Sequence, residues 1–161
     1  MDIQYRHIKC GEESAVAELV EAVFMAHVAP LYTPEGIEEF LGYAEVSEFT
    51  RRLQREHVIL VAIAGVDEDA QIVGMIEIRE QRHISLLFVA GAYQGRGIAT
   101  ELLARAIQLC RRVNPGLRAL TVHASPNAAP IYRRLGFAPS AEEQVVHGIR
   151  YTPMTLVLKN D

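Results

Sequence analysis

Apolar residues recur at helical spacing in the first third of the chain and at strand spacing after it. Between residues 14 and 56 the spacing predicts two helices, the second of which can be a broken pair. Ser14 is the expected cap of the first helix, which Pro30 closes, and Thr33 followed by Pro34 predicts the start of the second. The first helix has one apolar face, which carries Val16, Leu19, Val20, Val23 and Phe24.

Three β-rich runs follow, at residues 58–65, 71–80 and 83–91. The acidic sequence VDEDA between the first two suits a hairpin connection. The third run, HISLLFVAG, is apolar enough to be covered on both faces. These runs predict the centre of a sheet, to which the short alternating segment IQYRHI near the start of the chain adds another strand.

A glycine turn and a strongly amphipathic helix come next, and the sequence NPG ends this helix. The strand LRALTVHAS follows, so residues 83–123 predict a strand, helix, strand crossover that is parallel and right-handed. Ser125 as cap, Pro126 in the first turn and Gly136 at the end predict a short helix, and EEQVVHGIR and MTLVLKN predict two terminal strands. The apolar stripe of the longer helix consists of Ile98, Leu102, Leu103, Ala106, Ile107 and Cys110.

Composition and charge narrow the classes of protein. The 161 residues are 50% hydrophobic and 22% charged, with no low-complexity stretch, which predicts one domain over residues 1–161. A net charge of −4 argues against nucleic acid as a partner. Nowhere do 18 uncharged apolar residues follow one another, so no membrane partner is expected. The two cysteines, Cys10 and Cys110, suggest no disulfide framework, and we expect a cytoplasmic protein.

The glycine turn raises a question of chemistry. Gly95 and Gly97 stand where the long helix begins, and a helix start presents unpaired N–H groups that attract phosphate. The alternative is a tight turn that binds nothing. A dinucleotide fingerprint needs a third glycine where Thr100 stands, and a Walker loop needs Lys followed by Ser or Thr, so neither motif is present.

The segment Gln94–Ala99 reads Q-x-x-G-x-A and resembles the acyl-CoA signature of the GNAT N-acyltransferase superfamily. The resemblance extends from LLFVAGAYQGRGIATELL to ASPNAAPIYRRLGF, and the order of elements matches over nearly the whole chain. It departs at Gly91, where the family often has proline. The resemblance implies an α/β, layered GNAT-like fold: a central mixed seven-stranded twisted sheet flanked by about four helices. The implied order is strand, two helices, three strands, helix, strand, helix, two strands.

The resemblance also implies a function. The protein would transfer an acetyl group from acetyl-CoA to a primary amine of an unidentified acceptor by direct attack. One alternative is a non-catalytic CoA-binding module with a regulatory or interaction role. A dinucleotide-dependent oxidoreductase is a more distant alternative. The donor would contact backbone groups of one strand, the pyrophosphate loop and one side chain near the short helix. The strand residues are Leu87, Phe88 and Val89, and the side chain is that of Asn127. The loop residues are Gln94, Gly95, Arg96, Gly97, Ile98, Ala99 and Thr100.

Tyr132 is the residue that the resemblance implies for protonation of the departing thiolate. A phenol with a pKa near 10 can donate a hydrogen bond to a thiolate whose pKa is about 8.5. Many relatives have a carboxylate base on the strand before the loop, and His83 occupies the comparable place here. Glu77 and His123 are weaker candidates for the base. Each of these residues can instead serve packing or lie on a solvated surface.

Further residues are candidates for contacts with the acceptor and with the CoA phosphates. Tyr32 and Tyr43 lie in the helical segment that overhangs the acceptor in this superfamily, and Arg133 and Arg134 can meet CoA phosphates. The terminal strands offer a sheet edge at which a homodimer can form. No metal is expected, because His7, His27, His57 and His147 form no ligand spacing with one another or with the cysteines.

Overall fold

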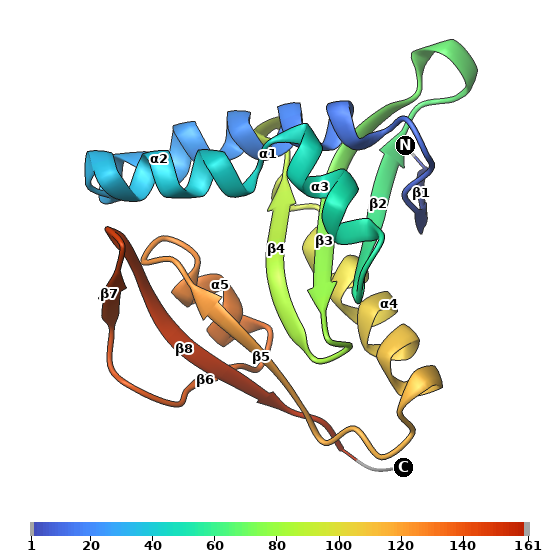
Figure 1. Cartoon of the computed structure of the whole chain (residues 1–161). Helices are drawn as coiled ribbons and strands as arrows, with labels where there is room; N and C mark the ends of the chain where they lie inside the picture. Colours follow the sequence, from blue (N-terminus) through green and yellow to red (C-terminus); the bar gives the residue numbers. More distant parts are fainter. Residues whose placement is uncertain (1, 160–161) are drawn as a thin grey trace.

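A single mixed sheet runs through residues 2–159, the part of the chain that the computed structural model describes. Its strands lie in the order β1-β2-β3-β4-β5-β8-β6, and β7 pairs with β8 (Figure 1). Only β4 and β5 are parallel neighbours, as expected for the strand, helix, strand crossover. The strands are β1 (Ile3–His7), β2 (His57–Ala64), β3 (Gln71–Arg79), β4 (His83–Val89), β5 (Ala119–Ala124), β6 (Ala138–Pro139), β7 (Gln144–Val146) and β8 (Ile149–Val157).

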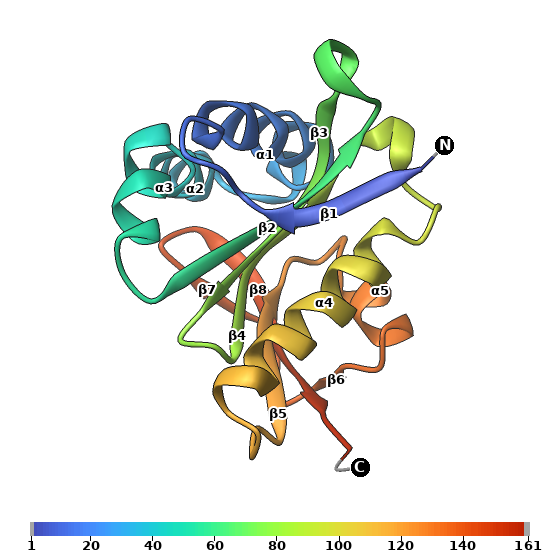
Figure 2. The ribbon, with the colours of Figure 1, turned by 90° about the vertical axis from the view of Figure 1, so that its right-hand side faces the viewer.

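Helices cover both faces of the sheet (Figure 2). One apolar core lies against α4, and a second lies against α1 and α3 on the opposite face. The predicted stripe of the long helix faces the first of these cores, with Leu102 and Ala106 fully buried. The helices are α1 (Glu13–His27), α2 (Pro34–Tyr43), α3 (Val46–Leu53), α4 (Ile98–Val113) and α5 (Ala129–Arg134).

A β-bulge at Ser85 decides which way the end of β4 faces. Ile84 pairs with Ile78 and Leu86 pairs with Glu77, so β4 has one more residue than β3 between these pairs. Ile84 therefore faces the core against α4, whereas Leu86 faces the core against α1. In a regular strand without a bulge, residues 84 and 86 would lie on one face, because strand side chains alternate.

β4 and β5 diverge immediately after they pair. Their register contains only two pairs, His83 with Thr121 and Ile84 with Val122, and Figure 1 shows the two strands separating beyond this point. The edge of β4 that faces β5 therefore has no strand partner from Ser85 to Val89. Unpaired N–H and C=O groups of this kind need another partner, which a ligand can supply.

Some predicted boundaries are confirmed and others are wrong. Thr33 caps α2 as expected, since its Oγ1 accepts a hydrogen bond from the Gly36 N–H at 3.1 Å. Ser14 and Ser125 cap no helix with their side chains: Glu12 precedes α1, and Ala128 precedes α5. The Ser125 hydroxyl instead donates to Asn127 Oδ1 at 2.7 Å, so the chain makes a turn before the helix starts.

The C-terminal part differs from the expected two strands. The predicted strand at residues 142–150 contains a hairpin turn, in which His147 and Gly148 both have positive φ, at 53° and 80°. The chain reverses there, so β7 ends at Val146 and β8 begins at Ile149. With the two-residue β6, the sheet has eight strands among the described residues. A His-Gly pair is a weaker hairpin signal than Asn-Gly, which explains the error.

Candidate active site

The divergence of β4 and β5 leaves a cavity of about 580 Å³. The glycine loop before α4 and the start of α5 form one end of it, and β4 forms its floor. Helices α1 and α2 contribute the opposite wall through Phe24 and Phe40. A cavity of this size, between strands and helix starts, is of the usual size for a small-molecule site.

The loop before α4 exposes main-chain amides. Gly95 and Gly97 have φ of 78° and 82°, and a Cβ built on either glycine would meet nothing within 4 Å. The first intrahelical bond runs from Glu101 N–H to Gly97 O, so the N–H groups of residues 98–100 precede it and lack a helical acceptor. The loop thus has the open space and the partial positive charge that a phosphate group needs.

Gln94 fixes this loop to the strand before it. Its side-chain Nε2 donates to Val89 O at 3.0 Å, which satisfies one carbonyl at the diverging end of β4. The Arg96 guanidinium lies 5.2 Å from the centroid of the Tyr93 ring and therefore lies along the loop. The side chain of Gln94 is thus structural, while the amides that follow it stay exposed.

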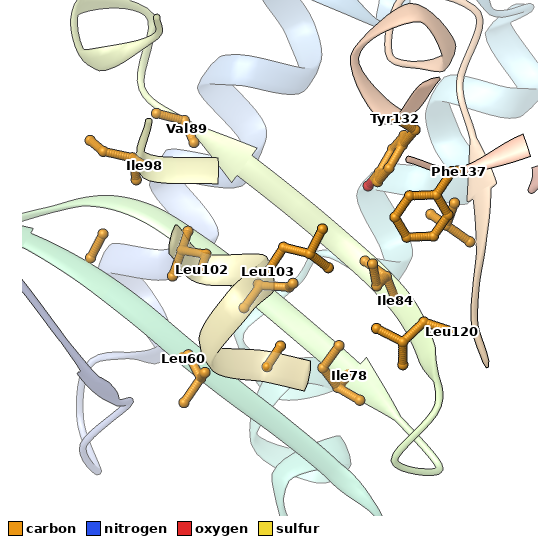
Figure 3. Close-up of a cluster of buried hydrophobic side chains, with 14 of the residues drawn as sticks. Leu60, Ile78, Ile84, Val89, Ile98, Leu102, Leu103, Leu120, Tyr132 and Phe137 are labelled. Carbon is orange, nitrogen blue, oxygen red and sulfur yellow. The ribbon is translucent and has the colours of Figure 1, made fainter. Parts of the chain in front are cut away.

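Tyr132 reaches the cavity from α5. It is 6% exposed, and its ring packs edge-on against Phe137 with centroids 5.2 Å apart. Figure 3 shows the ring extending from α5 toward β4, with the hydroxyl oxygen at its tip. Burial raises the pKa of this phenol well above its usual value of 10, so the hydroxyl stays protonated at neutral pH and can donate its hydrogen.

Two histidines lie side by side across β4 and β5. Their rings meet edge to face with centroids 4.8 Å apart. His123 lines the cavity and stacks on Tyr151 of β8 at 4.3 Å, whereas His83 lies outside the cavity-lining residues of the described chain, with Nδ1 2.7 Å from Thr121 Oγ1. Burial lowers both pKa values, that of His83 to about 4, so both rings are neutral at pH 7.

Glu77 is a structural residue and not a cavity residue. Its carboxylate is fully buried and accepts from Arg52 Nε at 2.8 Å and Nη2 at 3.2 Å. His57 Nδ1 lies 2.6 Å from the same carboxylate, and the Arg52 guanidinium covers the Tyr43 ring at 3.6 Å. This network ties α3 to β2 and β3. Of the two expectations for Glu77, a base or a solvated surface residue, neither matches this placement.

Glu77→Gln should lower the free energy of unfolding by about 2 kcal/mol, because the Arg52 charge would stay buried without its carboxylate. The control is Glu48→Gln, which removes a mostly exposed i,i+3 partner of Arg51 and should cost less than about 0.5 kcal/mol. Urea unfolding of both variants measures the difference. Equal losses would contradict the structural role of the buried pair.

Two glycines bring α2 against the β7–β8 hairpin. The Gly36 backbone lies so close to Gly148 that a Cβ on either residue would overlap the other's main chain. Thr33 Oγ1 also lies 3.5 Å from Gly148 O, so the cap of α2 and the hairpin turn meet (Figure 1). This contact closes the molecule over the wide end of the divergence between β4 and β5.

The structure brings most of the predicted site residues together. Tyr32 also lines the cavity, while Arg96, His83 and Tyr43 are outside the lining residues of the described chain. Sequence reasoning missed the wall from α1, because Phe24 and Val28 carry only the helical signal of core residues. The predicted residues that line the cavity are Leu87, Phe88, Val89, Gln94, Gly95, Gly97, Ile98, Ala99, Thr100, Asn127 and Tyr132.

Comparison with known proteins identifies the family. A family model described as an acetyltransferase (GNAT) domain matches residues 28–158. The chain belongs to the GNAT acetyltransferase family. It is 30% identical over 145 residues to an uncharacterized N-acetyltransferase, YafP, from Escherichia coli strain K12, covering 89% of this chain and 87% of YafP.

Solved GNAT structures share the fold. A GCN5-related N-acetyltransferase from Rhodopseudomonas palustris superposes with a TM-score of 0.81 and 25% identity, covering 98% of this chain and 97% of that one. PaiA N-acetyltransferase from Thermoplasma acidophilum, in complex with coenzyme A, gives a TM-score of 0.78 at 17% identity, covering 98% and 100%. The expected fold class is confirmed, and the protein is an acyl-CoA-dependent N-acyltransferase.

Residues 2–159 have neither a helix suited to crossing a membrane nor a metal-binding cluster. None of the helices there is both long and apolar enough to span a bilayer. Within the same residues, His, Cys, Asp and Glu side chains form no group of three that could hold a metal ion.

Proposed function

We propose that this GNAT protein transfers the acetyl group of acetyl-CoA to a primary amine by direct attack. The observation that carries the proposal is that one cavity is lined both by the glycine loop and by Tyr132. The diphosphate of the donor would occupy the loop, and its pantetheine arm would pair with the unpaired edge of β4 at Leu87 and Val89. Asn127 is placed to donate from its side-chain amide, since its Oδ1 already accepts from Ser125.

In this mechanism the amine lone pair attacks the thioester carbonyl and forms a tetrahedral intermediate. The C–S bond then breaks, the electron pair goes to sulfur, and Tyr132 donates its proton to the thiolate. A buried phenol is suited to this step because it stays protonated at neutral pH and can donate a hydrogen bond to the sulfur while negative charge develops there; water returns the proton to Tyr132 after the transfer. The amine loses one proton in the same sequence, so a base or water must accept it.

His123 is the base that the geometry favours. It lines the cavity, whereas His83 lies behind it, and a pKa of about 4 makes His83 a poor acceptor for a proton from an ammonium group. We therefore assign His123 as the base that accepts the proton of the amine. His83 would hold the His123 ring in position, because the two rings are in edge-to-face contact. The stack on Tyr151 holds the other side of the His123 ring.

The proposal is tested with purified protein, acetyl-CoA and a panel of primary amines, read by release of free thiol. Turnover, together with calorimetric binding of CoA, supports an acetyltransferase. Binding of CoA without turnover on any amine would favour the non-catalytic CoA-binding module instead. Absence of CoA binding would contradict both.

The pH profile tests the role of His123. Protonation removes the lone pair of the ring, so kcat/KM should fall as pH drops through the lowered pKa of His123, below its usual value of about 6.5. In His123→Gln this acid limb should disappear, and kcat/KM at pH 7.5 should fall by about 10²-fold.

His7→Gln is the control for this experiment, because His7 lies on β1 and lines a different pocket. Its profile should match that of the wild type. An unchanged acid limb in His123→Gln would exclude His123 as the base.

A further inference from the structure

Four aromatic residues close the end of the cavity opposite the glycine loop. We call them the aromatic wall: Phe24 of α1, Tyr32 before α2, Phe40 of α2 and Phe88 of β4, all of which line the cavity. Phe24 and Phe40 stack with centroids 3.9 Å apart and planes at 8°. Tyr32 meets Phe24 edge-on at 5.6 Å, and Phe88 meets Phe40 at 6.0 Å. The rings thus form one continuous apolar surface.

No carboxylate belongs to the described residues that line the cavity. Among the described residues that line it, the ionisable side chains other than tyrosine are His27, His123 and Arg134. Two acidic residues directly adjoin lining residues in sequence, Glu39 and Glu101, and both lie outside the lining: Glu39 is exposed, and Glu101 pairs with Arg105. Glu77 is fully buried with Arg52 and His57. A second ammonium group on the acceptor would therefore lose its water without gaining a counter-charge, which is costly.

The wall is also not a cage for a cation. Cation–π binding uses the faces of aromatic rings, and here one face of Phe40 is covered by the Phe24 ring, which is itself fully buried. Burial raises the pKa of Tyr32 to about 12, so its phenol stays neutral and supplies no negative charge. The partly exposed rings of Tyr32, Phe40 and Phe88 are suited to packing against another aromatic ring.

Resting on the proposed acetyl transfer, we infer that the acceptor is an arylalkylamine, a primary amine with one positive charge and an aromatic ring on its carbon chain. The ring packs against the aromatic wall, and the amine points to His123 and the thioester. Polyamines and aminosugars with several ammonium groups are excluded as preferred acceptors. We assign the aromatic wall to the acceptor rather than to the acyl group. Helices α1 and α2 cover the sheet face opposite α4 and its glycine loop, and α2 meets the hairpin through Gly36.

The test compares 2-phenylethylamine with spermidine. With acetyl-CoA, kcat/KM should be at least about 10²-fold higher for 2-phenylethylamine. A binding test with the CoA complex requires no turnover. In this test 2-phenylethylamine should raise the melting temperature of the protein at concentrations where spermidine does not. Equal or better use of spermidine, or equal binding of both amines, would overturn the inference. Loss of CoA binding itself would instead contradict the proposed function.

Variants of the residues that line the cavity distinguish the contribution of ring contact from that of charge to the choice of amine. Phe40→Leu should weaken 2-phenylethylamine binding about tenfold and leave the Kd of CoA unchanged. His27→Glu places a carboxylate at the exposed rim and should shift the ratio of spermidine to 2-phenylethylamine turnover at least tenfold toward spermidine, whereas His27→Gln should leave it unchanged. A Phe40→Leu protein that changes its selectivity among acyl-CoA chain lengths but not among amines would overturn the assignment.

Discussion

Tyr132→Phe should lower kcat by about 10³-fold and change the Kd of CoA less than twofold. The hydroxyl is the only polar atom lost, and the ring keeps its edge-on contact with Phe137, so packing and binding are retained. The thiolate then leaves without a proton donor, which raises the barrier of the step in which the C–S bond breaks. Thiol release under saturating acetyl-CoA measures kcat, and calorimetry measures the Kd.

Tyr151→Phe is the matched control for this prediction. Tyr151 stacks on His123 and donates its hydroxyl to Gln144 Oε1 at 3.1 Å on the exposed hairpin. It also loses one hydroxyl near the cavity, yet it should keep kcat within about threefold, because an exposed hydrogen bond contributes little. A comparable fall in kcat in the two variants would contradict the role of Tyr132 as the proton donor.

Gly97→Asp should weaken CoA binding by about 10³-fold. Two unit negative charges 4 Å apart repel by about 4 kcal/mol at an effective dielectric constant of 20, and the loop faces the diphosphate in our proposal. Asp is among the non-glycine residues that adopt positive φ most readily, and a Cβ at Gly97 would meet nothing within 4 Å, so the fold should persist. Calorimetry with CoA gives the change in Kd, and the melting temperature reports the fold.

Gly97→Asn separates charge from backbone strain. Gly97 has φ of 82°, where both Asp and Asn are strained to a similar extent, but Asn adds no charge. We expect Gly97→Asn to bind CoA at least about tenfold more tightly than Gly97→Asp, with a gap that narrows in high salt. Equal binding by the two variants would mean that the loop amides do not receive an anion.

Local signals explain which parts of the structure could be predicted. Gly95 and Gly97 before an amphipathic helix, and the apolar run that becomes β4, each specify their conformation within a few residues. The caps at Ser14 and Ser125 failed because a cap signal competes with turns: the Ser125 hydroxyl is used by Asn127. The extra residue at Ser85 in β4 leaves no mark in the apolar pattern, since a bulge is visible only against the partner strand.

The acceptor side of the site was the least predictable. The aromatic wall joins α1, α2 and β4, and its residues look like ordinary core residues when each segment is considered alone. His83 and His123 were both visible as candidates, but only the register of β4 against β5 shows which ring faces the cavity. The proposed donor site lies mostly within residues 87–100, whereas the proposed acceptor site depends on contacts between distant segments.

The contact between Thr33 and Gly148 spans 115 residues of sequence. Closing so long a chain loop costs conformational entropy, so α2 and the hairpin can meet only once the segments between them are ordered. Amide exchange in α2 should therefore report opening of this junction without global unfolding.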